Sequence, residues 1–313
     1  MTLAIVFPGQ GSQSVGMLSA LAEHSPLVRS TFGEASEVLG YDLWQRCQDG
    51  PAEALNSTEC TQPAMLAAGV ATYRVWRAQG GAVPERMAGH SLGEFSALVA
   101  AGCLDFKTAV DVVRERARAM QAAVPVGAGA MAAILGLEDA QVEAACRDAA
   151  AGEVVEAVNF NAPGQVVIAG NAGAVARAIE SATARGAKRA IALPVSVPAH
   201  SSLMMPAAEA LRARLESARL DAPSAIAVYG VDVRIHTEPV AMRAALVRQL
   251  HTPVRWAATV RAMLDAGATT LIECGPGKVL TSLNRRIDKN RDLKMLAVED
   301  PASLEAALAA AGS

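Results

Sequence analysis

The chain has 313 residues, of which 52% are hydrophobic and 19% charged, so it can bury one large core or two smaller ones. Aromatic residues make up only 4%, which leaves aliphatic side chains to fill that core, as in α/β proteins. This composition excludes a disordered chain and a collagen-like repeat. The formal net charge of −3 gives no overall field that attracts nucleic acid or an anionic membrane.

Neither a leader nor a membrane-spanning segment is expected. The apolar start at residues 3–7 has no basic region before it and is cut by Pro8, which argues against a signal peptide. No apolar run reaches the ~18 residues of a spanning helix. The five cysteines form no CxxC pair, which argues against a disulfide framework and a zinc site. We therefore expect a cytoplasmic protein.

Short aliphatic runs alternate with helical patterns, which predicts a mostly parallel sheet with helices on both faces. The expected strands and helices of this kind lie at residues 3–7, 86–88, 91–101, 107–124, 204–218 and 270–273. A βαββαβ order typical of a ferredoxin-like unit interrupts them. Its expected elements lie at residues 131–135, 139–149, 154–159, 165–169, 173–185 and 189–193. Glycines and prolines flank it as hinges, so we expect an α+β subdomain at 126–197, inserted in a main domain formed by 1–125 and 198–313.

Gly-His-Ser-Leu-Gly at residues 89–93 matches G-x-S-x-G, a sharp strand-to-helix turn that presents a serine hydroxyl above a sheet. A short strand is expected before it and a helix after it. The N-terminus of that helix favours the negative charge of a tetrahedral intermediate beside Ser91. From this motif alone two interpretations stay open: a nucleophile, or a serine that only caps a helix.

Arg116 falls on the apolar side of the expected helix at 107–124. The apolar residues on that side are Val110, Val113, Ala117, Met120 and Val124. A guanidinium directed into a core keeps its proton and needs a carboxylate or phosphate partner. It could form a structural ion pair with Asp or Glu, or it could hold the carboxylate of a substrate.

A serine nucleophile needs a base, and five histidines are candidates. They are His24, His90, His200, His236 and His251. His200 follows the inserted unit and precedes a helix, where loop residues usually face the top of the sheet. Its position favours it as the base of Ser91.

The first strand runs into a glycine-rich turn at residues 7–13. This turn lacks the third glycine of the dinucleotide fingerprint and the lysine of a P-loop, so a nucleotide site is not favoured. A turn after the first strand can instead donate a second backbone N–H to an oxyanion, beside that of Leu92. Gln10 is the residue placed to do so.

Together these segments resemble the malonyl-CoA:acyl carrier protein transacylases, a family that supplies malonyl groups to fatty-acid synthesis. The resemblance runs in order through nearly the whole chain. Its segments are Phe-Pro-Gly-Gln-Gly-Ser-Gln at 7–13, Thr-Gln-Pro at 61–63, Gly-His-Ser-Leu-Gly-Glu at 89–94, Arg116, Asn-Phe-Asn at 159–161, Pro-Gly-Gln at 163–165, the loop 196–200, and Gly-Pro-Gly-Lys at 275–278.

The resemblance implies roles for five residues around the predicted nucleophile. Ser91 would be the nucleophile and His200 its base. The backbone N–H groups of Gln10 and Leu92 would form the oxyanion hole. The backbone carbonyl of Gln249, rather than an aspartate, would orient the His200 ring.

The resemblance also implies that Arg116 binds the malonyl carboxylate, with Gln62, Asn159 and Asn161 as candidates for lining the pocket. It implies an α/β-hydrolase-like main domain with a ferredoxin-like insertion. It requires no metal or cofactor, because malonyl-CoA is a substrate.

The function that follows is malonyl transfer from malonyl-CoA to the phosphopantetheine thiol of acyl carrier protein, through a malonyl-serine intermediate and ping-pong kinetics. The partners would be malonyl-CoA and acyl carrier protein, with no nucleic acid or membrane, and we expect a monomer. Three alternatives share the fold: a malonyl transferase subunit of a malonate decarboxylase, a serine hydrolase, and a carrier-binding module without activity. Arg116 argues against the hydrolase, whose pocket has no use for a buried cation.

An acidic carrier protein needs a local basic patch. The densest basic stretch, expected around the mouth of the site, comprises Lys278, Arg285, Arg286, Lys289, Arg291 and Lys294. Lys278, Arg285 and Arg286 are the candidates for carrier docking, and a solvated helix face without a partner is the alternative. A second candidate patch is formed by Arg185, Lys188 and Arg189.

Overall fold

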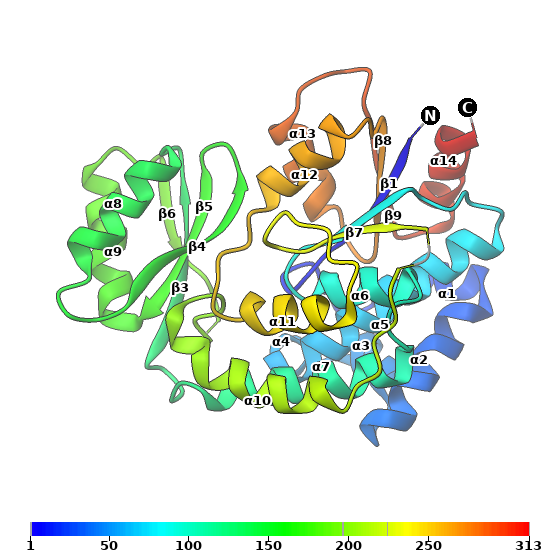
Figure 1. Ribbon diagram of the computed structural model, residues 1–313, viewed down its shortest axis with the longest axis horizontal. Coiled ribbons are helices and arrows are strands. Elements are labelled where there is room, and N and C mark those ends of the chain that lie inside the picture. The colour runs from blue at the N-terminus through cyan, green and yellow to red at the C-terminus, as the bar shows by residue number, and fades with distance from the viewer. Residues whose placement is uncertain (1, 196, 224, 313) are drawn as a thin grey trace.

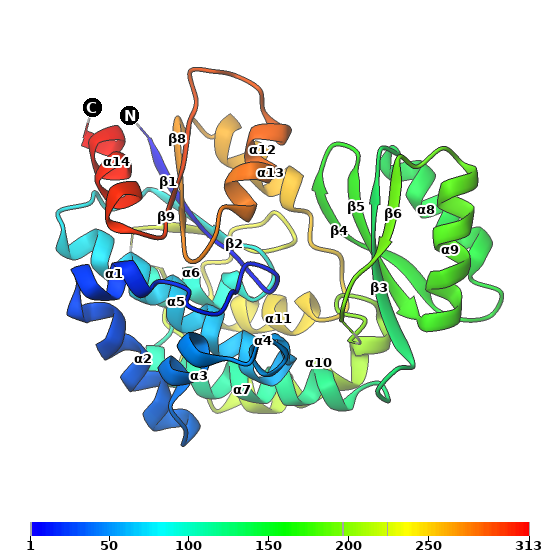
Figure 2. The same ribbon diagram turned by 180° about the vertical axis from the view of Figure 1, so that it is seen from behind.

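The computed structural model describes residues 2–195, 197–223 and 225–312, and within them two sheets. A parallel sheet surrounded by helices lies beside a smaller antiparallel sheet (Figure 1). The two termini lie close together at the parallel sheet, on the side away from the antiparallel one (Figure 2). Of the helices within the described ranges, not one combines the length and apolarity that a bilayer crossing demands.

The five parallel strands have the order β7-β2-β1-β8-β9. They are β1 (Leu3–Phe7), β2 (Arg86–Gly89), β7 (Ala227–Tyr229), β8 (Thr270–Cys274) and β9 (Lys294–Val298). Every residue of β1 and β8 is buried, as expected for central strands covered on both faces. The predicted parallel sheet is confirmed.

The side chains of β1 alternate between two cores, as strand geometry requires. Leu3, Ile5 and Phe7 join the larger core. The helices that complete it are α1 (Ser19–His24), α2 (Pro26–Leu39), α3 (Leu43–Asp49), α4 (Ala52–Asn56), α5 (Thr58–Ala78), α6 (Gly93–Ala100), α7 (Phe106–Ala122), α10 (Met205–Glu216), α11 (Pro239–Gln249) and α14 (Pro301–Gly312). Ala4 and Val6 face α12 (Trp256–Asp265) and α13 (Val279–Ile287) on the other side.

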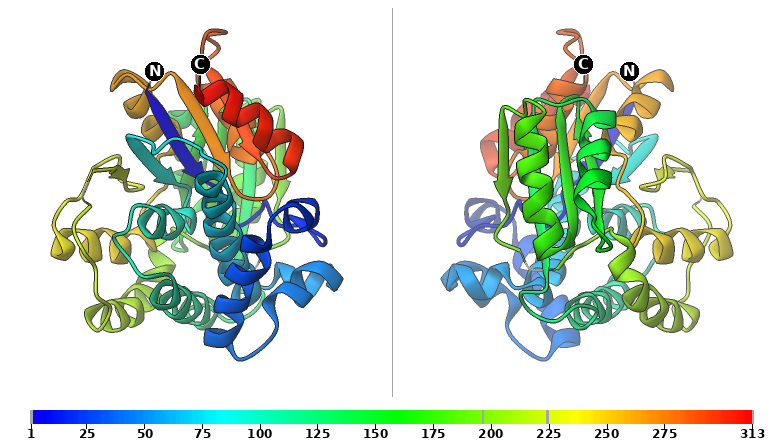
Figure 3. Two further views of the ribbon diagram at one scale, coloured as in Figure 1. Left: turned by 90° about the vertical axis from the view of Figure 1, so that its right-hand side faces the viewer. Right: turned by 90° about the vertical axis from the view of Figure 1, so that its left-hand side faces the viewer.

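The antiparallel sheet has the strand order β4-β5-β3-β6. Its strands are β3 (Gly129–Leu135), β4 (Val155–Ala162), β5 (Gln165–Asn171) and β6 (Arg189–Ala192). The helices α8 (Asp139–Ala149) and α9 (Ala172–Ala184) cover its outer face and share a core with it (Figure 3). The predicted βαββαβ order is therefore present. The inner face carries Met131, Val158 and Val167 toward the rest of the molecule.

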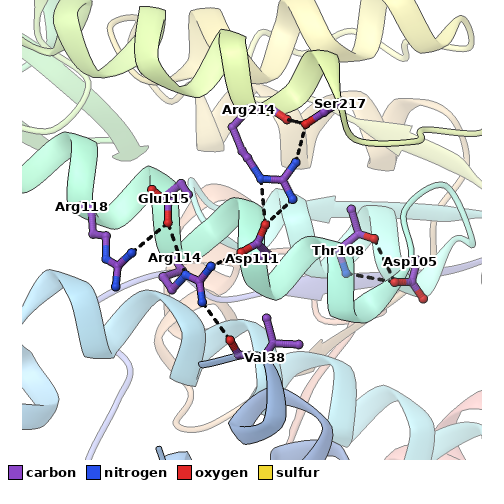
Figure 4. A network of polar contacts seen from close by, with 9 residues as sticks. All are labelled: Val38, Asp105, Thr108, Asp111, Arg114, Glu115, Arg118, Arg214 and Ser217. Atoms are coloured by element: carbon purple, nitrogen blue, oxygen red, sulfur yellow. Dashed lines mark hydrogen bonds and ion pairs between the residues drawn. The ribbon is translucent and has the colours of Figure 1, made fainter. Parts of the chain in front are cut away.

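A polar network fixes α7 against its neighbours (Figure 4). Asp111 on α7 accepts hydrogen bonds from Arg114 on the same helix and from Arg214 on α10. Arg114 also donates to the carbonyl of Val38 on α2, at 2.8 Å. About a quarter of each of these three charged side chains is exposed, so solvent screens the ion pairs only in part. Three helices are thereby held around Asp111.

Replacing Asp111 by Ala should lower the free energy of unfolding by about 1–2 kcal/mol, because two half-buried guanidinium groups lose their shared carboxylate. Thermal unfolding measures this effect. Arg219→Ala is the control, since its ion pair with Asp221 is largely exposed and should contribute less than about 0.5 kcal/mol. Equal shifts for the two variants would contradict the network's role.

Candidate active site

Ser91 lies on a sharp turn between β2 and α6. Its φ of 52° is left-handed, an unusual conformation for a serine. A Cβ on Gly89 would lie 1.8 Å from the carbonyl carbon of Gly93, and one on Gly93 would lie 2.1 Å from the carbonyl oxygen of Phe7. Both positions therefore require glycine. The predicted strand-to-helix turn is confirmed, with the serine at its apex.

His200 is hydrogen-bonded to the serine. The Ser91 Oγ–H donates to Nε2 of His200 at 2.7 Å, because Nδ1 donates to the backbone carbonyl of Gln249, also at 2.7 Å. Burial and then the charge of Arg116 lower the pKa of His200 to about 3. The imidazole is therefore neutral at physiological pH, with its free lone pair directed at the hydroxyl. This is the arrangement of a nucleophile and its general base.

A cavity of about 450 Å³ opens in front of this pair, between the carboxyl ends of the parallel strands and the antiparallel sheet. Ser91, Leu92 and His200 contribute to its wall from one side. Met131 and Val167 contribute from the other. Ligand sites in open α/β sheets usually lie at this end of the strands.

Gln10, in the turn after β1, and Leu92 line the cavity together with Ser91. Each of the two carries a backbone N–H group. Within the described ranges neither group donates a hydrogen bond to the protein. A pair of free donors next to a nucleophile can hold the oxygen of a tetrahedral intermediate.

Arg116 reaches the same cavity from α7 and is 1% exposed. It donates to Oε1 of Gln62 at 2.6 Å, to Oε1 of Gln249 at 2.9 Å and to Oγ of Ser91 at 3.3 Å. No carboxylate of a described residue contacts it, and its Nε has no partner there. The structural ion pair considered from the sequence is therefore absent. Burial lowers the pKa of Arg116 to about 10, so it still carries its charge at neutral pH.

The chain is similar in sequence to proteins of one known family. Residues 4–298 match the acyl transferase domain family. The chain is 55% identical to the malonyl CoA-acyl carrier protein transacylase of Escherichia coli, over 97% of this chain and 98% of that one. It belongs to this transacylase family.

Solved structures of malonyl transferases have the same fold as this chain. An acyl carrier protein S-malonyltransferase from Vibrio cholerae is 57% identical, with a TM-score of 0.94 over 98% of this chain and 99% of that one. A malonyl-transacylase solved in complex with a type II PKS acyl-carrier protein is 53% identical, with a TM-score of 0.96 over 99% of this chain and 100% of that one. The resemblance drawn from the sequence is confirmed.

The other predicted residues of this transacylase lie in two places. Gln62 and Asn159 line the cavity, and the buried Oδ1 of Asn159 has no partner among the described residues. Asn161 is absent from the wall and is hydrogen-bonded to Nε2 of His90 at 2.8 Å, which ties the nucleophile turn to β4. Ser196, in the loop before His200, lies outside the described residues.

The basic stretch lies away from the cavity wall of the transacylase. Lys278 pairs with Glu299, and Arg285 donates to the carbonyl of Met295. Arg286 is hydrogen-bonded to Gln165 in the antiparallel sheet. No residue of 278–294 is among those that line the cavity. The structure therefore does not support the expectation that this stretch surrounds the mouth of the cavity.

Two buried groups of the transacylase site have no counterpart among the residues predicted from the sequence. Glu94, 4% exposed, accepts from the Nε2 of Gln249 at 2.7 Å and from the backbone N–H of Val231 at 3.2 Å. Burial raises the pKa of this carboxyl to about 7. The side chain of Gln249, a residue expected to act through its backbone carbonyl, joins Glu94 to Arg116. The signal was a charged residue at position 94 in an otherwise apolar run.

A serine-directed fluorophosphonate should label this transacylase once, at Ser91, as measured by intact mass. Ser91→Ala should abolish the labelling, and His200→Ala should slow it roughly 10²- to 10⁴-fold, because the general base is lost. Ser282→Ala, an exposed serine on α13, should react like the unmodified protein. Persistent labelling of Ser91→Ala would show that another residue is the nucleophile.

Proposed function

We propose that this protein transfers the malonyl group from malonyl-CoA to the phosphopantetheine thiol of acyl carrier protein and so supplies fatty-acid synthesis. The observation that carries the proposal is the buried cation of Arg116, 3.3 Å from the Ser91 hydroxyl and without a carboxylate partner among the described residues. A site that keeps such a cation beside a nucleophile suits an acyl group that itself carries a carboxylate. The name of the Escherichia coli relative supports the same activity.

The first half-reaction forms a malonyl ester on Ser91. His200 takes the hydroxyl proton at Nε2 while Oγ attacks the thioester carbonyl. The backbone N–H groups of Gln10 and Leu92 hold the resulting oxyanion. The intermediate collapses, the carbon–sulfur bond breaks, and the coenzyme A thiolate takes the proton back from His200.

The second half-reaction runs in reverse with a different thiol. The phosphopantetheine thiol gives its proton to His200, and its sulfur attacks the malonyl ester. The bond to Ser91 Oγ breaks, and Oγ recovers the proton. Because one site serves both thiols in turn, the kinetics are ping-pong. Each step uses only groups of the protein and its substrates, so the proposed mechanism needs no metal or cofactor.

Throughout both steps the malonyl carboxylate would accept hydrogen bonds from Arg116. Gln62 holds one side of the guanidinium at 2.6 Å. The unpartnered Oδ1 of Asn159 offers an acceptor to a donor group of the substrate. These two residues are our proposed polar lining of the pocket, whereas Asn161 supports it from behind through His90.

We further propose the domain organisation expected from the sequence. The main domain, 1–125 and 198–313, would be α/β-hydrolase-like, supported by a nucleophile turn that directly follows a parallel strand. The insertion, 126–197, would be ferredoxin-like. In chain order its strands stand 2-3-1-4 in the sheet, which supports that assignment.

The direct test is to incubate the protein with malonyl-CoA and then with holo acyl carrier protein, following each by intact mass. We expect a malonyl adduct on the enzyme that moves to the carrier. An adduct lost to water as fast with the carrier as without it would indicate a hydrolase. An adduct that only the carrier of a malonate decarboxylase can remove would favour the decarboxylase subunit. No adduct would contradict the proposal.

Arg116→Ala should change donor selectivity. Losing a charge-assisted bidentate contact costs about 2–5 kcal/mol, roughly 30- to 5,000-fold in kcat/KM for malonyl-CoA. Acetyl-CoA has no carboxylate and should lose much less. Arg118→Ala is the control on the same helix, because Arg118 is exposed and, among the described residues, its hydrogen bond and ion pair are with Glu115. Equal losses for the two donors would contradict the assignment of Arg116.

Carrier docking gives a separate prediction. If the acidic carrier binds the basic stretch, then Arg285→Glu with Arg286→Glu should raise the KM for the carrier and weaken its salt dependence. The malonyl-CoA half-reaction should be retained, since Ser91 is acylated before the carrier binds. Arg189→Glu on the antiparallel sheet tests the second patch in the same assay. An unchanged KM in the Arg285 and Arg286 variant would exclude this stretch.

A further inference from the structure

A buried chain of three side chains runs behind the nucleophile. Nη2 of Arg116 donates to Oε1 of Gln249 at 2.9 Å, and Nε2 of Gln249 donates to Oε2 of Glu94 at 2.7 Å. Gln249 is fully buried, Arg116 is 1% exposed and Glu94 is 4% exposed. We call these three residues the relay. Its charged ends lie on α7 and α6, and its neutral centre is the last residue of α11.

The chemistry of the neighbours allows only one orientation of the Gln249 amide. A guanidinium can only donate hydrogen bonds, so it must face the amide oxygen. An ionised carboxylate and a backbone carbonyl can only accept, and the amide nitrogen donates to both Glu94 and the carbonyl of Ser91, the latter at 3.1 Å. Turning the amide over would create three unfavourable contacts when Glu94 is ionised, and two when it is protonated. Gln249 is therefore fixed by charge on one side and by acceptors on the other.

The relay keeps opposite charges close without letting them touch. A direct ion pair would place a carboxylate on the guanidinium fork, where it would compete with a carboxylate substrate. With an amide between them, Glu94 still offsets the buried positive charge, while Nε of Arg116 has no protein partner among the described residues. Glu94 itself is held by the N–H of Val231 and lies in the first turn of α6, where negative charge is favoured.

Gln249 also connects the relay to the base. Its backbone carbonyl accepts from Nδ1 of His200, while its side chain accepts from Arg116. One residue thus sets the direction of both the imidazole and the guanidinium. Removing its side chain alone leaves the contact to His200 in place, which makes the two functions separable by experiment.

We propose that Glu94, acting through the side chain of Gln249, is a positioning residue that orients Arg116 toward the carboxylate of the acyl donor. This inference rests on the proposed malonyl transfer and extends it to the residues that set donor selectivity. Neither residue touches the donor. Their effect reaches it only through the guanidinium.

Glu94→Gln tests the charge, because the substituted amide can still accept from Gln249 and Val231. Measurements at pH 8 keep the carboxylate of the unmodified protein ionised. We expect the KM for malonyl-CoA to rise and the malonyl-to-acetyl ratio of kcat/KM to fall about 10-fold or more. Gln249→Met, which keeps the chain length and the backbone carbonyl, should lower the same ratio. Acylation by acetyl-CoA should fall less than acylation by malonyl-CoA in both variants.

Glu273→Gln is the matched control. Glu273 is another fully buried glutamate, but it accepts from the backbone N–H groups of Leu280 and Thr281 at the start of α13. This variant should lower the melting temperature and leave the malonyl-to-acetyl ratio unchanged. If Glu94→Gln behaves in the same way, its role is structural and the inference is wrong.

A double variant separates this inference from the proposed function. If Glu94 acts through Arg116, adding Glu94→Gln to Arg116→Ala should not lower the ratio further. Additive losses would overturn the inference. A normal ratio in Arg116→Ala would contradict the assignment of Arg116, whereas the absence of a malonyl adduct in the unmodified protein would overturn the proposed function itself. A ratio that falls in Arg116→Ala but not in Glu94→Gln would overturn the relay alone.

Discussion

Arg116 carries a positive charge that is almost fully removed from water, 3.3 Å from the Ser91 hydroxyl. A guanidinium keeps its proton even when it is buried, so its N–H groups need acceptors from the residues around it. Gln62 comes from α5 and Gln249 from α11, while Glu94 on α6 stands one amide further away. The four helices α5, α6, α7 and α11 must therefore keep fixed positions relative to one another around the Arg116 side chain. The Asp111 network, which holds α7 against α2 and α10, stabilises the helix that carries that charge.

The strained backbone at Ser91 and His200 is also held in place by neighbouring segments. Ser91 and His200 both have positive φ, 52° and 67°, at a cost of about 1–3 kcal/mol each. The glycines around Ser91 allow its turn, and the end of α11 holds His200. The carbonyl of Leu250 accepts from the backbone N–H of His200 at 3.0 Å, next to the Gln249 carbonyl that accepts from its ring. The conformations that direct the two reacting atoms at each other are thus maintained by neighbouring backbone.

Helices and strands with a clear spacing of apolar residues were predicted correctly from the sequence. The helix at Asp139–Ala149 and the strand at Leu3–Phe7 have the expected bounds, and the burial of Arg116 followed from helical phase. No helix was expected between residues 14 and 85, where α5 is buried on nearly every side and so shows no apolar stripe. Pro63 lies inside that helix, a position that is unfavourable for a helix. The bond between Glu94 and Gln249 joins residues 155 positions apart, which no local pattern can reveal. The contacts of Gln249 with both His200 and Arg116 are evident only in the structure.

The same charge that would bind a donor also acts on the base. Arg116 is the second cause, after burial, of the low pKa of His200, because a nearby cation disfavours the imidazolium that forms when Ser91 is deprotonated. In the proposed complex a donor carboxylate on Arg116 offsets that cation, and the imidazolium then forms more readily. An acetyl group brings no such charge, so the pKa of His200 stays low. In the proposed mechanism Arg116 would therefore favour a malonyl donor twice, once when the donor binds and again when His200 takes the proton. Glu94 offsets the same cation only from a greater distance, since the amide of Gln249 separates its carboxylate from the guanidinium.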